Sequence, residues 1–310
     1  MKTLPIALAA GALLASGFTA GSPAYAAPSG GTPTIEVLSH NVQMLPPILG
    51  GKANATRADL IAKADYVKRH DVVVFQEAFD NGPSNTLKSR LATQYPYQTP
   101  VLGRSTSGWD ETLGAYSSLA PEDGGVTILS KWPITHRIQY VYSGGCGADA
   151  LSNKGFVYVQ LEVDGTPVHV VGTHVQAEDP LCFGDGAAVR AEQFAEIDEF
   201  LDGLAIPADE QVIVAGDLNV DRASPEYADL LAATDTGAPT AYAGHPFSWD
   251  PTTNPLATGG QEHLDYVLHR RGHVRPQVWT NTVLTPASPP WEHAGTAHTD
   301  YSDHYPVAGS

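Results

Sequence analysis

Basic residues are scarce in this chain of 310 residues. Lysine and arginine together number 17 against 34 aspartates and glutamates, which gives a formal net charge of −17. No basic run is longer than the pairs Lys68-Arg69 and Arg270-Arg271. Proteins that bind nucleic acid usually cluster basic residues, because neutralising phosphates supplies most of their non-specific affinity. The composition therefore disfavours nucleic acid as a partner.

A membrane anchor is also lacking from the sequence pattern. The apolar stretch at residues 4–14 is too short to span a bilayer and is followed by Gly, Ser and Pro. Lys2 before this stretch and Ala24-Tyr25-Ala26 after it form the pattern of a secretory signal peptide. We therefore expect a secreted, extracellular protein with a signal peptide at residues 1–26, a flexible N-terminus at residues 27–33 and one catalytic domain at residues 34–310. No coiled-coil pattern is present, and we expect a monomer.

Cysteine occurs only twice, at Cys146 and Cys182, so the chain can form at most one internal disulfide. Export to an oxidising compartment and the loop-like sequences around both residues favour a bridge between them. The loop-closure model gives such a bridge roughly 3.5–4 kcal/mol of stabilisation. The alternative is two buried thiols.

Hydrophobic residues, at 42%, are abundant enough for a sizeable core, and they fall mostly into short runs of strand character. We expect strands at residues 35–42, 72–75, 125–130, 134–141, 155–163, 167–173, 212–220 and 264–268. We expect helices at residues 56–70, 85–93, 187–204 and 225–232. Asp164-Gly165 between two of these strands predicts a hairpin, because both residues tolerate positive φ values. Hairpins mixed with βα units favour an α+β fold, a four-layer α/β/β/α sandwich of two mixed sheets with helices outside.

Polar residues capable of chemistry follow the apolar runs at one strand end after another. They are Asn41, Gln76-Glu77, Thr173-His174, Gly216-Asp217-Leu218-Asn219, Asp265 and Ser302-Asp303-His304. A single polar strand end is ordinary turn chemistry, but six that supply carboxylates, amides and histidines indicate one shared site. That set suits metal-assisted hydrolysis of a phosphoester.

Glu77 and Asn41 are the candidate ligands of a hard divalent cation. Mg²⁺ prefers oxygen ligands and typically takes only one or two carboxylates together with substrate phosphate. A lone Glu at a strand end is most often a solvated turn residue, and only its neighbours favour the metal-binding interpretation.

Asp217 and Asn219 alternate along the strand and its turn, so we expect both side chains to point the same way, toward a phosphoryl group. Gly216 permits a close approach of the backbone. The alternative for this tetrapeptide is an Asx-turn without a catalytic role.

Two of the 12 histidines stand out. His174 ends an alternating strand, and His304 follows Asp303 just before a final apolar run. A catalytic imidazole needs a carboxylate that fixes its tautomer, and Asp265 is the candidate partner. The sequence leaves open which histidine acts as the acid and which as the base. We interpret the histidines without motif context as surface or hydrogen-bonded residues: His40, His70, His136, His169, His245, His269 and His273.

The ordered set of strand ends, together with Ser39-His40-Asn41-Val42 and Leu264-Asp265-Tyr266-Val267, resembles the signature of the endonuclease/exonuclease/phosphatase superfamily with the deoxyribonuclease-I-like fold. Within it, the chain looks like a secreted bacterial neutral sphingomyelinase of the C type. The segments that carry this closer likeness are Pro121-Glu122-Asp123-Gly124-Gly125-Val126, Ser130-Lys131-Trp132-Pro133-Ile134, Asn153-Lys154-Gly155, His174-Val175-Gln176-Ala177-Glu178-Asp179 and Tyr301-Ser302-Asp303-His304-Tyr305-Pro306.

This resemblance implies hydrolysis of sphingomyelin to ceramide and phosphocholine with Mg²⁺, or with Mn²⁺ or Co²⁺ as alternatives. It implies a central metal on Glu77 with Asn41 and His304 beside it. It further implies a peripheral metal on Asn81, Glu122 and Asp123, and a disulfide between the two cysteines. The implied catalytic residues are His174, Asp217, Asn219, Asp265, Asp303 and His304.

The chain departs from membrane-lysing relatives in one segment. Those relatives carry exposed aromatic clusters on a hairpin, whereas residues 285–299 offer Trp291 alone among the large aromatic residues. We therefore expect weak, reversible contact with bilayers, made through Trp291. The alternative is a packing role for Trp291, with the membrane contact on another loop.

Two other functions remain open. A secreted metal-dependent nuclease of the same fold would share the central motifs, and only the acidity and the closer motifs disfavour it. A non-catalytic lipid-binding module would lack part of the site, yet every member of the set is present.

Overall fold

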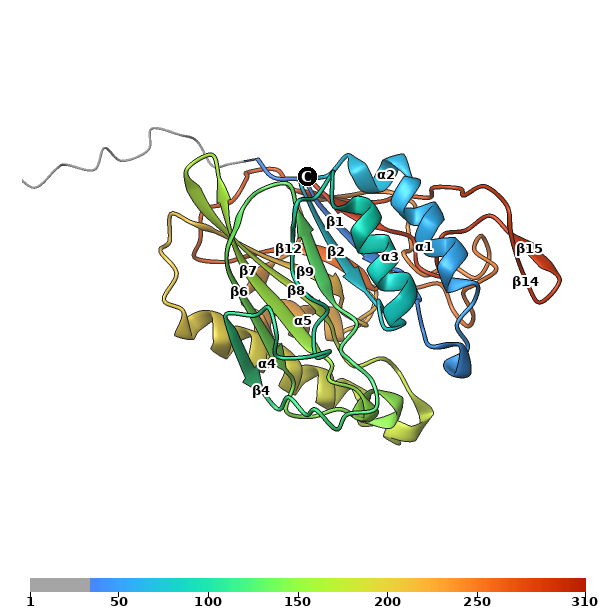
Figure 1. Cartoon of the computed structure of the whole chain (residues 1–310). Helices are drawn as coiled ribbons and strands as arrows, with labels where there is room; N and C mark the ends of the chain where they lie inside the picture. Colours follow the sequence, from blue (N-terminus) through green and yellow to red (C-terminus); the bar gives the residue numbers. More distant parts are fainter. Residues whose placement is uncertain (1–33) are drawn as a thin grey trace, which may run out of the picture.

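The apolar strands of the sequence form two mixed sheets that pack face to face, with helices on their outer surfaces (Figure 1). The computed structural model describes residues 34–310. The predicted signal peptide and flexible N-terminus lie outside the described residues. The expected four-layer sandwich is confirmed. Within residues 34–310, no helix has both the length and the apolar character needed to cross a membrane.

The first sheet has seven strands in the order β11-β13-β16-β1-β2-β5-β3. In chain order their bounds are β1 Val37–Asn41, β2 Val72–Gln76, β3 Tyr97–Gln98, β5 Thr127–Ser130, β11 Ala241–Gly244, β13 Thr280–Val283 and β16 Val307–Gly309. The pairs β1–β2 and β11–β13 are parallel and the others antiparallel. The late strand β16 therefore lies between β13 and the first strand of the chain.

The second sheet has seven strands in the order β10-β12-β9-β8-β7-β6-β4. In chain order their bounds are β4 Glu111–Gly114, β6 Ile134–Val141, β7 Gly155–Val163, β8 Thr166–His174, β9 Gln211–Asp217, β10 Thr236–Gly237 and β12 Asp265–Arg270. The pairs β8–β9 and β4–β6 are parallel. The predicted hairpin between β7 and β8 is confirmed, with Asp164 at φ 50° and Gly165 at φ 83°.

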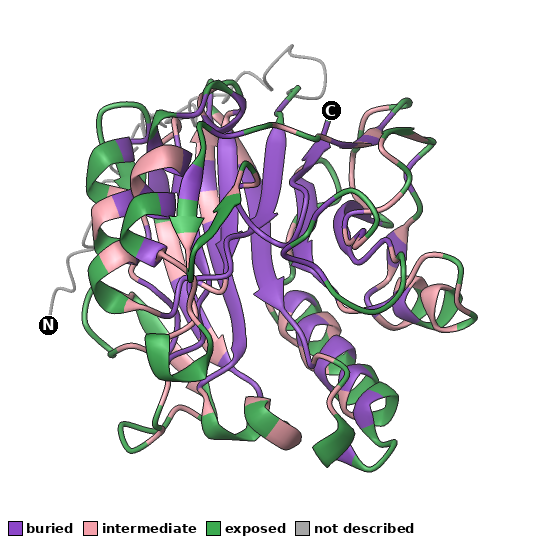
Figure 2. Ribbon diagram, turned by 90° about the vertical axis from the view of Figure 1, so that its right-hand side faces the viewer, coloured by how far each residue is buried: buried purple, intermediate pink, exposed green. Residues whose placement is uncertain are grey.

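Each central strand is buried on both faces, which explains why its sequence is continuously apolar (Figure 2). In β2, Val72 and Val74 pack into the core between the two sheets. Val73 and Phe75 alternate with them and pack under the helices of the first sheet. The same alternation along both sheets produces the layers of the sandwich.

Helices α1 (Asn54–Lys63), α2 (Asp65–Lys68) and α3 (Asn81–Leu91) cover the first sheet. Helices α4 (Gly186–Gly203) and α5 (Glu226–Ala233) cover the second. The helix expected at residues 56–70 is split into α1 and α2 at Ala64, whose backbone is extended at ψ 134°. The helix expected at residues 85–93 begins at Asn81 instead, since Pro83 is tolerated within a first helical turn.

Three short 3-10 helices lie in the loops of one end of the molecule: η1 (Pro47–Leu49), η2 (Gly147–Leu151) and η3 (Pro180–Cys182). The disulfide between Cys146 and Cys182 is confirmed, with the two Cα atoms 5.1 Å apart. It joins η2 to η3 and rules out the alternative of two buried thiols.

The expectation for Trp291 is wrong. Residues Trp291–His293 and Thr296–His298 form a small hairpin, β14–β15, that projects from the body of the molecule (Figure 1). Trp291 itself is only 3% exposed. Its ring stacks on His298 at 4.7 Å, its Nε1 donates to the Asp300 carbonyl at 2.8 Å, and the Arg57 guanidinium lies 5.8 Å from the ring. These contacts make Trp291 a packing residue rather than a membrane contact.

Candidate active site

The polar strand ends converge because of the strand directions. β1 runs parallel to β2, and β8 runs parallel to β9, so Asn41, Glu77, His174 and Asp217 follow strands that end at one edge of the sandwich. β12 runs antiparallel to β9 and begins at this edge, where Asp265 pairs with Asp217. The result is a cleft of about 460 Å³. The predicted residues that line it are Glu77, His174, Asp217, Asn219, Asp303 and His304.

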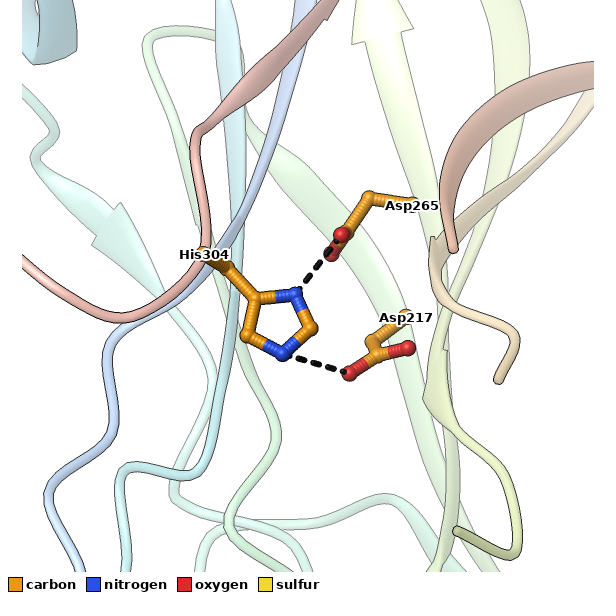
Figure 3. Close-up of side chains that lie close together, drawn as sticks. All are labelled: Asp217, Asp265 and His304. Atoms are coloured by element: carbon orange, nitrogen blue, oxygen red, sulfur yellow. Dashed lines mark hydrogen bonds and ion pairs between the residues drawn. The ribbon is translucent and has the colours of Figure 1, made fainter. Parts of the chain in front are cut away.

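His304 lies between two carboxylates (Figure 3). Its Nδ1 is 2.8 Å from Asp265 Oδ2, and its Nε2 is 3.6 Å from Asp217 Oδ2. Burial alone would lower the pKa of His304, but Asp265 and Asp217 outweigh burial and raise that pKa well above its ordinary value. Burial and the neighbouring Asp265 raise the pKa of Asp217 to about 6.

Asn41 bridges the two sheets. Its Nδ2 donates to Glu77 Oε1 at 2.9 Å and to Asp217 Oδ2 at 3.0 Å. Burial and the carboxylate of Asp303 raise the pKa of Glu77 to about 7. Within the described part of the chain, no Lys, Arg or His nitrogen lies within ion-pair distance of Glu77. A half-buried carboxylate without an ion-pair partner fits the binding of a hard cation.

Three non-glycine residues near the cleft adopt left-handed backbone conformations: Gln43 at φ 46°, Glu77 at φ 54° and Asn219 at φ 49°. Such strain persists where the surrounding structure enforces it, and it is typical of functional sites. Gly216 meets a steric requirement, because a Cβ atom there would lie 2.0 Å from the Thr173 carbonyl oxygen. Gly216 thus lets β9 lie close to Thr173 of β8, whereas nothing in the sequence pointed to the strained residues.

Asn219 does not continue the strand alternation from which its side-chain direction was predicted, because β9 ends at Asp217. The Asn219 backbone N–H donates to Asp217 Oδ1 at 3.1 Å, which forms the Asx-turn that the sequence left as the alternative. The Asn219 Nδ2 donates to the Val175 carbonyl at 3.2 Å. Both residues nevertheless line the cleft, so the turn does not exclude them from the site.

His174 lies near Asp217, with Nε2 3.6 Å from Asp217 Oδ2. Burial and the charge of Lys154 lower its pKa well below the ordinary value. Lys154 Nζ is 3.3 Å from His174 Nε2, 2.7 Å from Asp149 Oδ2 and 3.1 Å from the Val175 carbonyl oxygen. Sequence reasoning assigned Lys154 no role, although the tripeptide Asn153-Lys154-Gly155 carried part of the family likeness.

In the described part of the chain, the Asp303 carboxylate makes no hydrogen bond to the imidazole ring of His304. Its carboxylate accepts hydrogen bonds from the Gln43 amide and, at 3.2 Å, from the Ser302 hydroxyl. Burial raises its pKa, against the nearby charges of His304 and Arg57. Asp303 therefore adds negative charge to the side of the cleft that holds Glu77.

The predicted peripheral metal ligands also lie together. Asn81, Glu122 and Asp123 line a separate cavity of about 170 Å³. Arg104 lines it too, and its Nε is 2.8 Å from Asp123 Oδ2. Asp123 Oδ1 accepts from the Gly125 N–H at 2.9 Å. A cation at this cavity would compete with Arg104 for Asp123.

The rim of the main cleft is acidic, which the sequence did not indicate. The acidic side chains there are Glu178, Asp221, Glu226 and Glu262. Arg190 Nε is 2.6 Å from Glu226 Oε1, and Arg190 Nη2 is 2.5 Å from Glu178 Oε1. Trp249 also lines the cleft and packs edge to face on His304 with ring centroids 4.9 Å apart.

Four of the seven histidines set aside are buried: His40, His70, His169 and His269. His40 is hydrogen-bonded to Tyr66 at 3.2 Å, and burial lowers its pKa to about 3. His269 packs on Trp279 with ring centroids 4.2 Å apart, and neither of its ring nitrogens has a hydrogen-bond partner within residues 34–310. The interpretation of His269 as a surface or hydrogen-bonded residue is therefore wrong.

Residues 38–304 match the Endonuclease/Exonuclease/phosphatase family. A protein described as phospholipase C from Staphylococcus aureus is 47% identical over 284 residues, which cover 88% of this chain and 86% of that protein. The crystal structure of sphingomyelinase C from Streptomyces griseocarneus is similar with a TM-score of 0.87 and 51% identity, covering 90% of this chain and 99% of that one. A mutant of beta toxin from Staphylococcus aureus with bound magnesium ions is similar with a TM-score of 0.86 and 46% identity, covering 89% and 98% of the two chains.

Proposed function

The chain belongs to the endonuclease/exonuclease/phosphatase family, and from this premise we propose that it is a secreted, metal-dependent phospholipase C that hydrolyses sphingomyelin to ceramide and phosphocholine. The observation that carries the proposal is the cleft in which His304, between Asp265 and Asp217, faces the hydrogen-bonded pair of half-buried Glu77 and buried Asn41. A proton-transfer group beside a carboxylate suited to a cation is the minimum machinery for metal-assisted phosphodiester hydrolysis.

Glu77 would hold the metal, with Asn41 beside it. Another group of side chains, Asp217, Asp265 and His304, also has ligand atoms within 4.8 Å of one another. In that group, however, both imidazole nitrogens of His304 face carboxylates, which suits the ring to proton transfer rather than to metal binding. The magnesium bound to the similar beta toxin supports Mg²⁺, with Mn²⁺ or Co²⁺ as substitutes. When bound, such an ion neutralises phosphoryl charge and lowers the pKa of water.

The histidines divide the proton chemistry. Asp265 fixes the tautomer of His304 and raises its affinity for a proton, which suits it to take the proton of the attacking water. His174 stays neutral, because burial and Lys154 lower its pKa. It therefore serves as a hydrogen-bonding group for the phosphoryl oxygens, together with Asn219. Asn41 keeps Glu77 and Asp217 at fixed positions across the two sheets.

The acidic rim supports a lipid substrate over nucleic acid. Glu178, Asp221 and Glu262 would repel a polyanionic strand, whereas phosphocholine presents a quaternary ammonium group. An aromatic face beside carboxylates binds such cations well, and Trp249 lines the same cleft. A nuclease of this fold would need a basic track along the cleft, and the described rim offers Arg190 already paired with Glu178 and Glu226.

The test is a product assay with the purified mature protein and Mg²⁺. Sphingomyelin, phosphatidylcholine and DNA are offered in parallel, and release of phosphocholine and of nucleotides is measured. We expect phosphocholine release from sphingomyelin and no cleavage of DNA. Cleavage of DNA at a comparable rate, lost in His304→Ala, would favour the nuclease instead.

A further inference from the structure

Exposed apolar side chains gather at the end of the molecule where the cleft opens. Among residues 34–310, the most exposed large apolar side chains include Ile48 at 92%, Leu119 at 90% and Phe183 at 88%. Their apolar neighbours in the same loops are Leu49, Leu151 and Leu181. η1, η2 and η3, which carry or adjoin five of these six residues, all lie at the lower right in Figure 1. Clusters of this kind on a soluble protein mark interaction surfaces.

Part of this cluster is hollowed into an apolar groove of about 350 Å³. Leu45, Ile48 and Leu49 line it on the side of η1, and Leu151 lines it on the side of η2. Phe79, which follows β2 and Glu77, contributes to its wall. Leu45 lines both this groove and the catalytic cleft. A ligand with a polar end in the cleft can therefore place its apolar part in the groove.

The loops that carry the cluster are held firmly in place. Pro46 and Pro47 restrict the backbone that presents Ile48. The disulfide between Cys146 and Cys182 ties η2 to η3, and so joins the loop of Leu151 to the loop of Phe183. A rigid apolar surface loses little conformational entropy when it is buried against a partner.

We propose that this surface, made by Ile48, Leu49, Leu119, Leu151, Leu181 and Phe183, docks on the headgroup region of a zwitterionic, sphingomyelin-containing bilayer, with the apolar groove receiving the hydrocarbon of the ceramide part. The inference rests on the proposed function, because only a lipid substrate links the cleft to the groove. The net charge of −17 and the groove residue Glu122 select a zwitterionic bilayer rather than an anionic one. The hairpin β14–β15 cannot replace this surface, since its Trp291 is packed inward.

The test compares two forms of the same substrate. Hydrolysis of sphingomyelin is measured in detergent micelles and in phosphatidylcholine–sphingomyelin vesicles, for wild type and for Ile48→Ser/Leu49→Ser. Docking through this surface predicts that the ratio of vesicle rate to micelle rate falls at least tenfold in the double variant. Val278→Ser is the matched control, because Val278 is 70% exposed but belongs to neither the cluster nor the groove, and its ratio should stay within twofold of wild type.

Two further measurements separate the possible failures. Phe183→Ser should lower the fraction of protein that floats with vesicles in a density gradient. This binding assay is run under conditions without substrate turnover, so it reports docking independently of catalysis. The proposed docking surface is wrong if the ratio of vesicle rate to micelle rate is unchanged in Ile48→Ser/Leu49→Ser. It is also wrong if that ratio falls equally in Val278→Ser. Absence of micelle hydrolysis in the wild type would instead overturn the proposed function. Trp291→Ala should reduce both rates in parallel, and a selective loss on vesicles would return the membrane contact to the hairpin.

Discussion

Ionisable side chains in the cleft are withdrawn from water, and their pKa values move in opposite directions. Burial raises the pKa of Glu77 to about 7 and that of Asp217 to about 6, while it lowers the pKa of His174. At His304, by contrast, the carboxylates of Asp265 and Asp217 outweigh burial and raise the pKa. Groups with separated pKa values in one cleft can hold and release protons in different steps of a reaction.

Glu77→Gln tests the carboxylate proposed to hold the metal. The substitution keeps the hydrogen bond to Asn41 but removes the charge, so we expect a rate loss of at least ~100-fold, the scale of one lost electrostatic stabiliser. Addition of excess chelator to the wild type should abolish phosphocholine release, and Mg²⁺ should restore it. Full turnover of the wild type in chelator would contradict the metal dependence.

His304→Ala and His174→Ala test the two imidazoles. Loss of His304 should lower the rate by ~10²–10⁴-fold, the usual cost of losing a positioned proton-transfer group. Loss of His174 should lower it by ~10²–10³-fold, the scale of one lost hydrogen-bond donor to developing charge. Far-ultraviolet circular dichroism should stay unchanged, since neither ring is part of the apolar clusters. Near-normal activity of either variant would remove that histidine from the mechanism.

His269 gives a prediction for stability rather than activity. Burial lowers its pKa from 6.5 to about 4, so the unfolded chain binds a proton more readily than the folded one between these pH values. Its contribution to stability is therefore intact above pH 6.5 and falls as the pH is lowered toward 4, by roughly 2 kcal/mol at pH 5. Urea unfolding at pH 7 and pH 5 measures this loss, which should be smaller in His269→Gln by about that amount. An identical loss in the variant would mean that His269 titrates normally in the folded protein.

Part of the site could be predicted from residues alone, and part could not. Asn41, Glu77, His174 and Asp217 follow apolar strands, and strand direction brings such ends together. Lys154 was not found in this way, although it directly precedes β7, because two of its three partners, Asp149 and Val175, lie in the loops between strands. The left-handed conformations of Gln43 and Glu77 likewise depend on tertiary packing, which no local pattern of these residues encodes.

At the scale of elements, prediction succeeded where the chain itself marks both ends. The bounds of β6 and β7 agree with the expected residues 134–141 and 155–163, because Pro133 and the Asp164-Gly165 turn delimit these apolar runs. Seven short strands within residues 34–310 escaped prediction: β3, β4, β10, β11, β13, β14 and β15. They have two to four residues each, and their partner strands, rather than their own sequence, make them strands.

The disulfide acts at this same scale. Replacing both cysteines by serine should lower the free energy of unfolding by roughly 3.5–4 kcal/mol, since the bridge closes a loop of 36 residues. Chemical denaturation of the double variant and of the wild type measures the difference. Peptide mapping should recover Cys146 and Cys182 linked in the wild type, which is two hydrogens lighter than its reduced form. Ready alkylation of both thiols without reductant would contradict the bridge.

At the scale of the whole molecule, the arrangement of β16 has a consequence for how the protein is made. His304 directly precedes this strand, and β16 fills the place between β13 and β1 in the first sheet. A growing polypeptide that stops short of residue 304 therefore lacks both the imidazole and the strand that joins the early and late parts of the sheet. The proposed hydrolysis cannot begin on a partly synthesised or partly exported chain. The membrane of the producing cell thus meets no working enzyme until translation has passed the final strand.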